Sequence, residues 1–336
     1  AGQHKPAAVA QWVKMRQSVL VKAFSCQRED VPALNTIRRT LAHDWVAAAL
    51  PRVLNRFLYE AYGGQQSEQV TLDGKTLRGT IPPGLTCGEH LLSAFLPTEG
   101  VVLAQAAVGA KENELVAAPQ LLDELDLRGR VVTGDALFTQ RNLSVQILSR
   151  GGHYLWPVKD NQQRLHDEVR LFFVPPRKAP GWSIQPLPQT VARTINNAHG
   201  RLEQRTLTAV VDETGFLDWP GARQVFKLVR QVTTSATGTV TVQEVYGVTS
   251  LPPERATATQ LLGFMRHHWR IENSLHYRRD VTLQEDETRM SNKHQTRTMA
   301  ALNNFIIGLA SKLGFGNLAF AQRSFEAKLT LALART

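Results

Sequence analysis

Two aspartates stand where short apolar segments of the sequence end. Asp73 follows Val70-Thr-Leu, and Asp135 follows Arg130-Val-Val-Thr-Gly. Functional groups gather at strand ends in open α/β sheets, so the two acids converge if these segments are neighbouring strands. Two converging carboxylates could hold a divalent metal ion. Asp-Gly is also an ordinary turn dipeptide and Gly-Asp an ordinary strand end, so position alone leaves a purely structural role open.

A third carboxylate, Glu272, lies on the apolar stripe of a predicted helix. The stripe has members three or four residues apart: Leu262, Met265, Trp269, Glu272 and His276. This spacing places them on one helix face, so Glu272 is expected to face the sheet rather than water. An acid in that position needs a partner, because burial of an unpaired charge is costly. A metal ion shared with Asp73 and Asp135 would be such a partner.

Two alternatives to this metal site remain open. Glu272 could instead form a local ion pair with one of three nearby arginines: Arg266, Arg270 and Arg279. Three other acids could provide the third carboxylate, although they lie beyond the stripe in a segment of turn-like composition: Asp280, Glu285 and Asp286.

Carboxylate oxygens are hard ligands, so three acids of this kind favour Mg²⁺ or Mn²⁺. Two such ions, about 3.5–4 Å apart, could activate a water or a 3′-hydroxyl and stabilise the leaving oxygen of an in-line phosphoryl displacement. Zinc is disfavoured because the 10 histidines and 2 cysteines form no closed ligand pattern. No P-loop or Gly-rich dinucleotide fingerprint appears, which argues against an ATPase or a dehydrogenase.

The composition describes a basic chain with a sizeable core. Its 336 residues contain 39 Lys+Arg and 29 Asp+Glu, a net charge of +10, and 43% are hydrophobic. The charge favours a polyanionic partner such as nucleic acid, or it marks an ordinary soluble basic protein. Cys26 and Cys87 read as reduced thiols, and no apolar run approaches the length of a membrane helix, so we expect a cytoplasmic protein. The chain starts at Ala1, so its natural beginning is expected to be missing.

The residue pattern also predicts the elements that would position the acids. The first 66 residues read as helices, with Asn35 as a candidate N-cap of a helix that continues to Pro51. The period then changes and predicts strands and helices in the order β-β-β-α-β-α-β, at 70–74, 90–96, 101–108, 112–125, 130–135, 140–150 and 153–158. Hairpin-linked strands followed by alternating helix and strand predict a mixed sheet with helices on its faces.

The second half of the chain divides into a β-rich part and a helical part. Segments 205–212, 224–230 and 239–246 alternate at period two and predict an insertion of three or more strands. Helices are predicted over 256–279 and 299–313. The positive charge lies at both ends: residues 1–66 contain 9 Lys+Arg and 4 acids, and residues 252–336 contain 12 Lys+Arg and 7 acids.

Several stretches together resemble the DDE transposases of bacterial insertion sequences, most closely the H-repeat-associated group, over roughly residues 10 to 315. The stretches are Leu72-Asp-Gly-Lys-Thr-Leu-Arg-Gly79, Val132-Thr-Gly-Asp-Ala-Leu-Phe138, Lys159-Asp-Asn-Gln162, His199-Gly-Arg-Leu-Glu-Gln-Arg205, His268-Trp-Arg-Ile-Glu-Asn-Ser-Leu-His276 and Asp280-Val-Thr-Leu-Gln-Glu-Asp286. This group is related to a branch that excises its element through DNA hairpins. The resemblance implies a ribonuclease-H-like core, with Asp73, Asp135 and Glu272 as catalytic acids and metal ligands.

The resemblance also implies how this chain departs from the hairpin-forming branch. That branch has Tyr, Arg, Glu and Lys along the last helix of the core. Here Glu272 is kept, whereas Met265, His268 and Arg279 occupy the other three positions, and Arg270 is a candidate substitute for the missing arginine. This departure leaves excision through DNA hairpins open as a question for this chain, whereas metal-dependent strand transfer is unaffected by it.

A further set of polar residues is expected to contact DNA. It comprises Arg38, Arg39, Lys75, Arg78, Lys159, Gln162, His199, Arg201, Arg205, His268, Arg270 and Arg279. Each has an ordinary alternative as a solvated turn, helix-face or sheet-edge residue. Arg38 and Arg39 would belong to a helix-turn-helix-like reader, while Lys75 and Arg78 follow the first catalytic strand. Trp269 is expected to be a core residue.

The sequence therefore predicts an α/β protein with a ribonuclease-H-like mixed sheet core, a β-rich insertion and helical N- and C-terminal regions. The expected domains are a DNA-binding region at 1–66, the first part of the core at 67–180, the insertion at 181–252 and core-completing helices at 253–336. The expected function is cleavage and strand transfer at terminal inverted repeats with two Mg²⁺ or Mn²⁺ ions, by a nucleoid-associated homodimer acting on double-stranded DNA. The alternatives are a ribonuclease-H-like nuclease or resolvase, and a silent transposase-derived DNA-binding protein.

Overall fold

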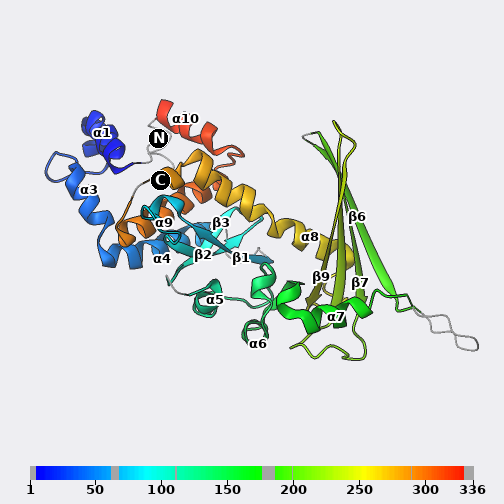
Figure 1. Ribbon diagram of the computed structural model, residues 1–336. Helices are drawn as coiled ribbons and strands as arrows, with labels where there is room; N and C mark the ends of the chain where they lie inside the picture. Colours follow the sequence, from blue (N-terminus) through cyan, green and yellow to red (C-terminus); the bar gives the residue numbers. More distant parts are fainter. Residues whose placement is uncertain are drawn as a thin grey trace, which may run out of the picture. The chain divides into compact units, whose positions relative to one another are not determined.

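A computed structural model describes residues 5–61, 68–109, 112–175, 186–198, 200–288 and 290–328 (Figure 1). The chain forms two compact units and passes between them four times. The first unit comprises Ala1–Ser67, Gly74–Leu121 and Arg270–Thr336, and the second comprises Glu68–Asp73 and Leu122–Trp269. Each unit is thus assembled from segments that are far apart in the sequence.

The first unit contains a hairpin and the helices that cover it. Strands β2 (His90–Leu96) and β3 (Val101–Val108) pair antiparallel. Helices α4 (Asp44–Ala61) and α9 (Lys293–Lys312) pack on β3 and on each other. The core between these elements contains Phe95, Val102, Ile271, Leu275, Ile307 and Leu318. Burial of these side chains holds the C-terminal part of the chain to the hairpin.

Four more helices of the first unit lie near the chain ends. They are α1 (Pro6–Met15), α2 (Gln17–Ala23), α3 (Leu34–Leu41) and α10 (Leu318–Ala327). The expected N-cap at Asn35 is wrong, because Asn35 lies inside α3, whose N-cap is Ala33. The expected helix end at Pro51 is also wrong, since Pro51 lies inside α4. Helix α5 (Glu114–Asp123) then leads the chain into the second unit.

The second unit contains most of the strands of a mixed sheet. Strand β1 (Gln69–Thr76) begins in this unit and ends in the first, and it pairs parallel with β4 (Val131–Thr133), which pairs parallel with β5 (His153–Val158). Four long strands follow: β6 (Gln189–Ala198), β7 (Arg201–Val211), β8 (Gln224–Thr234) and β9 (Val240–Thr249). The strand order is β3-β2-β1-β4-β5-β9-β8-β7-β6. The predicted α/β class with a mixed sheet is confirmed.

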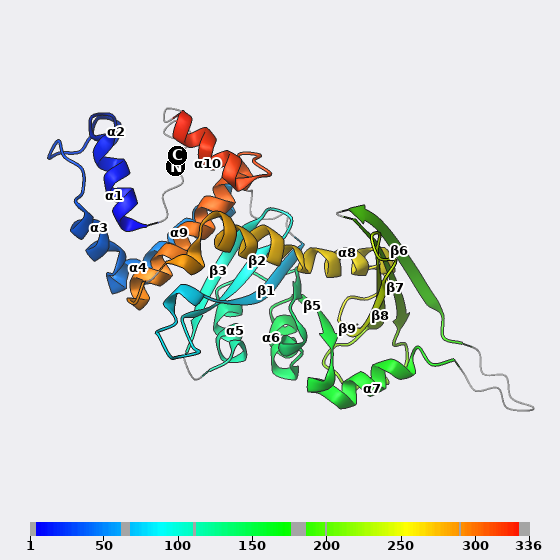
Figure 2. The same cartoon turned by 45° about the horizontal axis from the view of Figure 1, so that its top comes forward.

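The β-rich insertion continues the sheet instead of forming a separate one. Strand β9 pairs antiparallel with β5, joining Leu155 to Thr249. Strands β6 to β9 then form one antiparallel ribbon (Figure 2). The sequence predicted three of these strands and missed β6, which is largely exposed along its length. Helices α6 (Arg141–Ser149) and α7 (Gln163–Leu171) also belong to this unit.

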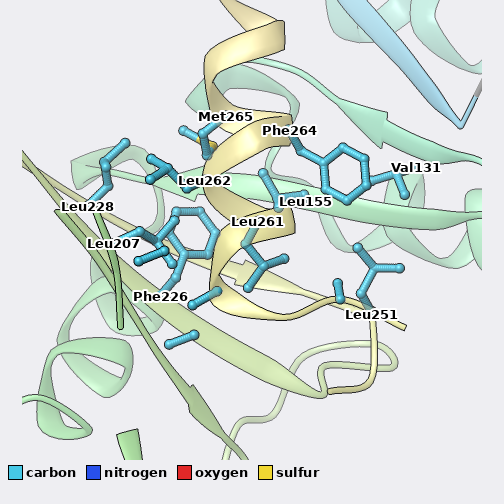
Figure 3. Packing of buried hydrophobic residues seen from close by; sticks show 14 residues of the cluster. Val131, Leu155, Leu207, Phe226, Leu228, Leu251, Leu261, Leu262, Phe264 and Met265 are labelled. Carbon is cyan, nitrogen blue, oxygen red and sulfur yellow. The ribbon is translucent and has the colours of Figure 1, made fainter. Parts of the chain in front are cut away.

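Helix α8 (Ala258–His268) packs its apolar face on this sheet. Leu261, Leu262 and Met265 are buried against Leu207 and Phe226 of the ribbon (Figure 3). A capping box at Thr257 and Gln260 satisfies backbone donors at the start of the helix. The helical spacing read from the sequence is therefore correct up to Met265.

Beyond α8 the chain stays helical to Thr282, as predicted to about residue 279, but not with regular α-helical hydrogen bonding. Trp269 forms a turn, and residues Glu272–His276 and Arg278–Thr282, which belong to the first unit, have π-helical hydrogen bonding. A π turn is wider than an α turn, so side chains shift around the axis relative to an ideal stripe. Among the described residues, no helix is long and apolar enough to cross a membrane.

Candidate active site

The two predicted strand-end aspartates lie at matching positions on neighbouring parallel strands. β1 and β4 pair with Thr71 opposite Thr133, and Asp73 and Asp135 each follow two residues later. The expectation that these strands are neighbours is confirmed. Asp73 is partly buried and Asp135 is exposed at the strand end. Two carboxylates at one edge of a parallel sheet form a donor set of hard oxygens, which suits Mg²⁺ or Mn²⁺.

A buried polar layer fixes the register of these two strands. Gln69 donates from Nε2 to Thr133 Oγ1 over 2.9 Å and to the Phe264 carbonyl oxygen of α8 over 3.0 Å. The hydroxyls of Thr71 and Thr133 lie 3.1 Å apart. A slip of one residue would break every one of these buried bonds, each of which is costly to leave unmade. These buried hydrogen bonds therefore keep the ends of β1 and β4 in register, so that Asp73 and Asp135 follow equivalent positions of the two strands.

The segment that follows β4 is tightly constrained. Asp135 accepts a hydrogen bond from the Leu137 backbone N over 2.9 Å, which caps the 3₁₀ turn Ala136–Phe138. At Gly134 an added Cβ would lie 2.6 Å from the Phe138 ring, so only glycine fits. Asn161 donates to the Ala136 carbonyl oxygen over 2.6 Å. The Leu137 bond orients the Asp135 carboxylate, and the other two contacts constrain the backbone on either side of it.

Two residues predicted to contact DNA follow β5. Gln162 donates from Nε2 to the Thr139 carbonyl oxygen over 3.0 Å, so its side chain braces the segment after Asp135. Lys159 is exposed beside it. The structure places both residues in the same unit as Asp73 and Asp135.

Glu272 has a different environment from the one that the stripe predicted. Its side chain is 66% exposed, whereas His276, one turn later, is buried, with its Nδ1 3.6 Å from Glu272 Oε2. The expectation that Glu272 is buried on the sheet is wrong, because the π-helical turn rotates it out of the apolar face. A solvent-accessible carboxylate beside an imidazole can still donate oxygen to a metal ion.

The three competing acids of the first unit are engaged in ion pairs. Lys75 Nζ lies 2.5 Å from Asp280 Oδ1 and 3.8 Å from Asp286 Oδ1. Asp286 also accepts a bond from the Arg78 backbone N over 3.0 Å. Lys75, predicted to contact DNA, is only 8% exposed and has its charge compensated by these acids.

The third competing acid, Glu285, forms a buried pair with Arg279. Arg279 Nε donates to Glu285 Oε2 over 2.7 Å, and Asn303 Nδ2 donates to Glu285 Oε1 over 2.9 Å. The Arg279 side chain is 0% exposed, so this residue supports the π-helical segment from inside the unit. The alternative ion pair between Glu272 and Arg279 is not formed, since Glu285 is the acid that pairs with Arg279.

The other residues predicted to contact DNA occupy mixed positions. Arg38, Arg39, Arg78, Arg201 and Arg270 are exposed, Arg205 is partly buried, and His268 is buried. His199 lies outside the described residues. The sequence did not single out Arg230, which lies directly across from Arg205 on β8; only the strand register reveals that pair.

Comparison with known proteins gives a consistent family signal. Residues 65–309 match a family model described as a transposase DDE domain. YbfL of Escherichia coli K12 is 27% identical over 297 residues, which cover 86% of this chain and 76% of YbfL. YhhI of the same strain, whose name places it among H repeat-associated transposases, is 26% identical over the same shares. A piggyBac transposase synaptic complex with hairpin DNA aligns with 90% of this chain and 60% of its own, at a TM-score of 0.43 and 13% identity.

Proposed function

Because the chain belongs to the transposase DDE domain family, we propose that it cleaves DNA at the terminal inverted repeats of an insertion sequence and joins the freed ends to target DNA. The observation that carries this proposal is the family match together with Asp73 and Asp135 at matching ends of adjacent parallel strands. The residues proposed to do the chemistry are Asp73, Asp135 and Glu272.

The three carboxylates would hold two Mg²⁺ or Mn²⁺ ions. When bound, such ions supply an activated water or 3′-hydroxyl and stabilise the leaving oxygen in an in-line displacement at phosphorus. The chain's own residues concentrate negative charge, which would repel a DNA phosphate unless cations were present. The strand register places Asp73 and Asp135, and the bond from the Leu137 N orients the Asp135 carboxylate. Glu272 is accessible to solvent.

The proposed partner is double-stranded DNA, both at the element ends and at the target. The basic N- and C-terminal regions would bind its backbone, with exposed Arg38, Arg39 and Arg270 among the contacts. We further propose that two copies act on paired ends, as a homodimer, in the bacterial cytoplasm and at the nucleoid.

A cleavage assay with matched variants tests the catalytic assignment. The substrate is a supercoiled plasmid carrying the element ends, incubated with Mg²⁺ or Mn²⁺. Asp73→Asn, Asp135→Asn and Glu272→Gln are each expected to abolish cleavage while leaving circular dichroism and DNA binding in EDTA unchanged. The control is Asp160→Asn, an exposed acid in the same unit as Asp73, which is expected to cleave normally. If any of the three variants cleaved the plasmid at the wild-type rate, the assignment of that residue would be refuted.

The same assay separates the two other functions. Supplying a target plasmid and sequencing the products distinguishes strand transfer, which gives joined ends, from hydrolysis by a nuclease or resolvase, which gives only free ends. Specific binding to the element ends, with no cleavage in Mg²⁺ or Mn²⁺, would identify a silent DNA-binding derivative.

A further inference from the structure

Two arginines lie directly opposite each other on the helix-covered face of the β6–β9 ribbon. Arg205 of β7 pairs in register with Arg230 of β8. Like charges in this arrangement repel each other, so the ladder is destabilised by the pair. Leu207 and Leu228, two residues along each strand, point to the same face and are buried against α8. The arginines therefore lie at the margin of the core, where a charge is not placed without a partner.

Helix α8 and the turn after it add a third arginine and an aromatic ring. The guanidinium carbons of Arg205 and Arg230 lie 5.9 and 6.0 Å from the centre of the Trp269 ring. Both distances allow a cation–π interaction, which holds the guanidinium groups in place. Arg266 of α8 is close enough to repel the positive charge of Arg205. Two guanidinium groups thus contact one tryptophan within the second unit, and a third lies close enough to repel that of Arg205.

Only one acid compensates these charges among the described residues. Glu203 Oε2 lies 2.7 Å from Arg205 Nη2, and Glu203 Oε1 accepts a bond from Arg230 Nε. Three positive groups and one negative group leave a formal charge of +2. Burial lowers the pKa of the Arg205 guanidinium, Arg230 and Arg266 lower it further, and Glu203 opposes them.

Several buried hydrogen-bond donors in the same row have no acceptor in the described structure. Arg205 Nε and Nη1 are buried without a partner, and so is Thr194 Oγ1. Thr194 is the residue directly across from Arg205 on β6. Unsatisfied buried donors are costly, so their concentration in one row points to an acceptor group that binds there.

We infer that Thr194, Arg205, Arg230 and Arg266, here called the arginine cluster, bind a phosphate group of the DNA backbone. A phosphodiester has one negative charge shared by two non-bridging oxygens, which match the planar guanidinium fork and would accept from the hydroxyl and the unpaired nitrogens. The excess charge of +2 would also be reduced by such an anion. The identity of the polyanion rests on the proposed function, whereas the anion-binding chemistry rests on the cluster itself.

Salt-dependent DNA binding tests the inference. Full-length protein is titrated with a fluorescent duplex carrying an element end, in EDTA, across a series of NaCl concentrations. Arg230→Gln is expected to reduce the slope of log K against log[NaCl] by about one and to weaken binding about tenfold, equally for specific and unrelated duplexes. Arg193→Gln is the matched control, because Arg193 lies on β6 but is exposed and alternates to the opposite face from Thr194. Equal effects of the two substitutions would overturn the inference.

Inorganic sulfate provides a readout that does not depend on DNA. Sulfate stabilises folded proteins in general, so the informative quantity is the difference between variants in the rise of Tm over chloride at equal ionic strength. Wild type and Arg193→Gln are expected to show a larger rise than Arg230→Gln. Thr194→Val, which removes only the hydroxyl, is expected to reduce the rise as well and guards against misfolding of an arginine variant.

The outcomes distinguish this inference from the proposed function. If Arg230→Gln lowers the sulfate response but wild type neither binds nor cleaves the element ends, the anion site stands and the proposed function fails. If wild type cleaves DNA while Arg230→Gln keeps the wild-type salt slope and sulfate response, the proposed function stands and the arginine cluster is refuted.

Discussion

Neutralising Glu285 is expected to destabilise the first unit strongly. The change Glu285→Gln removes the negative charge that pairs with Arg279 Nε over 2.7 Å, inside a site where the arginine side chain is 0% exposed. Arg279 Nη1 and Nη2 already have no hydrogen-bond partner among the described residues. The variant would therefore leave a buried guanidinium with no compensating charge.

Because the Arg279–Glu285 pair is buried, the expected loss of stability is large. Breaking a buried pair by removing one partner costs about 3–5 kcal/mol, against a total stability of about 5–15 kcal/mol for a typical domain. A loss in the middle of this range corresponds to a drop in Tm of roughly 10 °C. The amide of Glu285→Gln would keep its acceptor for Asn303, so the loss reflects mainly the missing charge.

The assay is urea unfolding followed by far-UV circular dichroism, with hydrogen exchange of α9 amides as a local probe. The double variant Arg279→Met/Glu285→Gln is expected to recover most of the loss, because it no longer buries an unpaired charge. The control is Glu60→Gln, which breaks the exposed Arg56–Glu60 pair and is expected to leave the unfolding midpoint unchanged. A midpoint for Glu285→Gln as high as that of wild type, or a double variant weaker than the single one, would refute the reasoning.

Two further predictions concern the second unit. Gly247→Ala is expected to destabilise this unit by about 1–3 kcal/mol, because a Cβ there would lie 2.6 Å from the Trp156 carbonyl oxygen. Gly263→Ala in α8 would bring its Cβ within 4 Å of no atom outside the helix and should stabilise the unit by about 0.5–1 kcal/mol. Urea midpoints that rank the two variants in the opposite order would contradict this prediction. Burial, and then Arg255, lower the pKa of His153 in the folded state, so its stabilising effect is present above the unfolded value of about 6.5 and is lost as the pH falls through the folded value. His153→Gln should therefore flatten the decline of unfolding free energy on acidification, and an unchanged pH profile would exclude His153 as a contributor.

Much of the fold could be predicted because the local patterns agree with the final structure. The predicted strands at 90–96, 101–108 and 153–158 coincide with β2, β3 and β5. Strand β6 was missed because it is largely exposed and carries no clear apolar alternation. Pro51 was read as a helix end, although tertiary packing of α4 on α9 keeps the helix continuous through it.

The candidate site could be predicted only as far as regular geometry holds. Asp73 and Asp135 follow from strand ends, and the parallel register places them at one level. The exposure of Glu272 could not be read from the sequence, because a stripe assumes 3.6 residues per turn and the π-helical segment breaks that period. The pairing of Lys75 with Asp280, and of Arg205 with Arg230, depends on contacts between residues far apart in the chain.

The division of the chain between two units has a consequence for its synthesis. Phe57 of α4 packs on Phe305 of α9 with ring centres 5.9 Å apart, so the ribosome must translate the whole second unit before these two helices can meet. At about 5–20 residues per second, the apolar face of α4 would wait roughly 10–50 seconds for its partner. During that interval the apolar surface of the incomplete first unit is open to chaperone binding or to aggregation. A copy of the gene interrupted between β3 and α9 would leave α4 with its contacts to β3 but without those to α9.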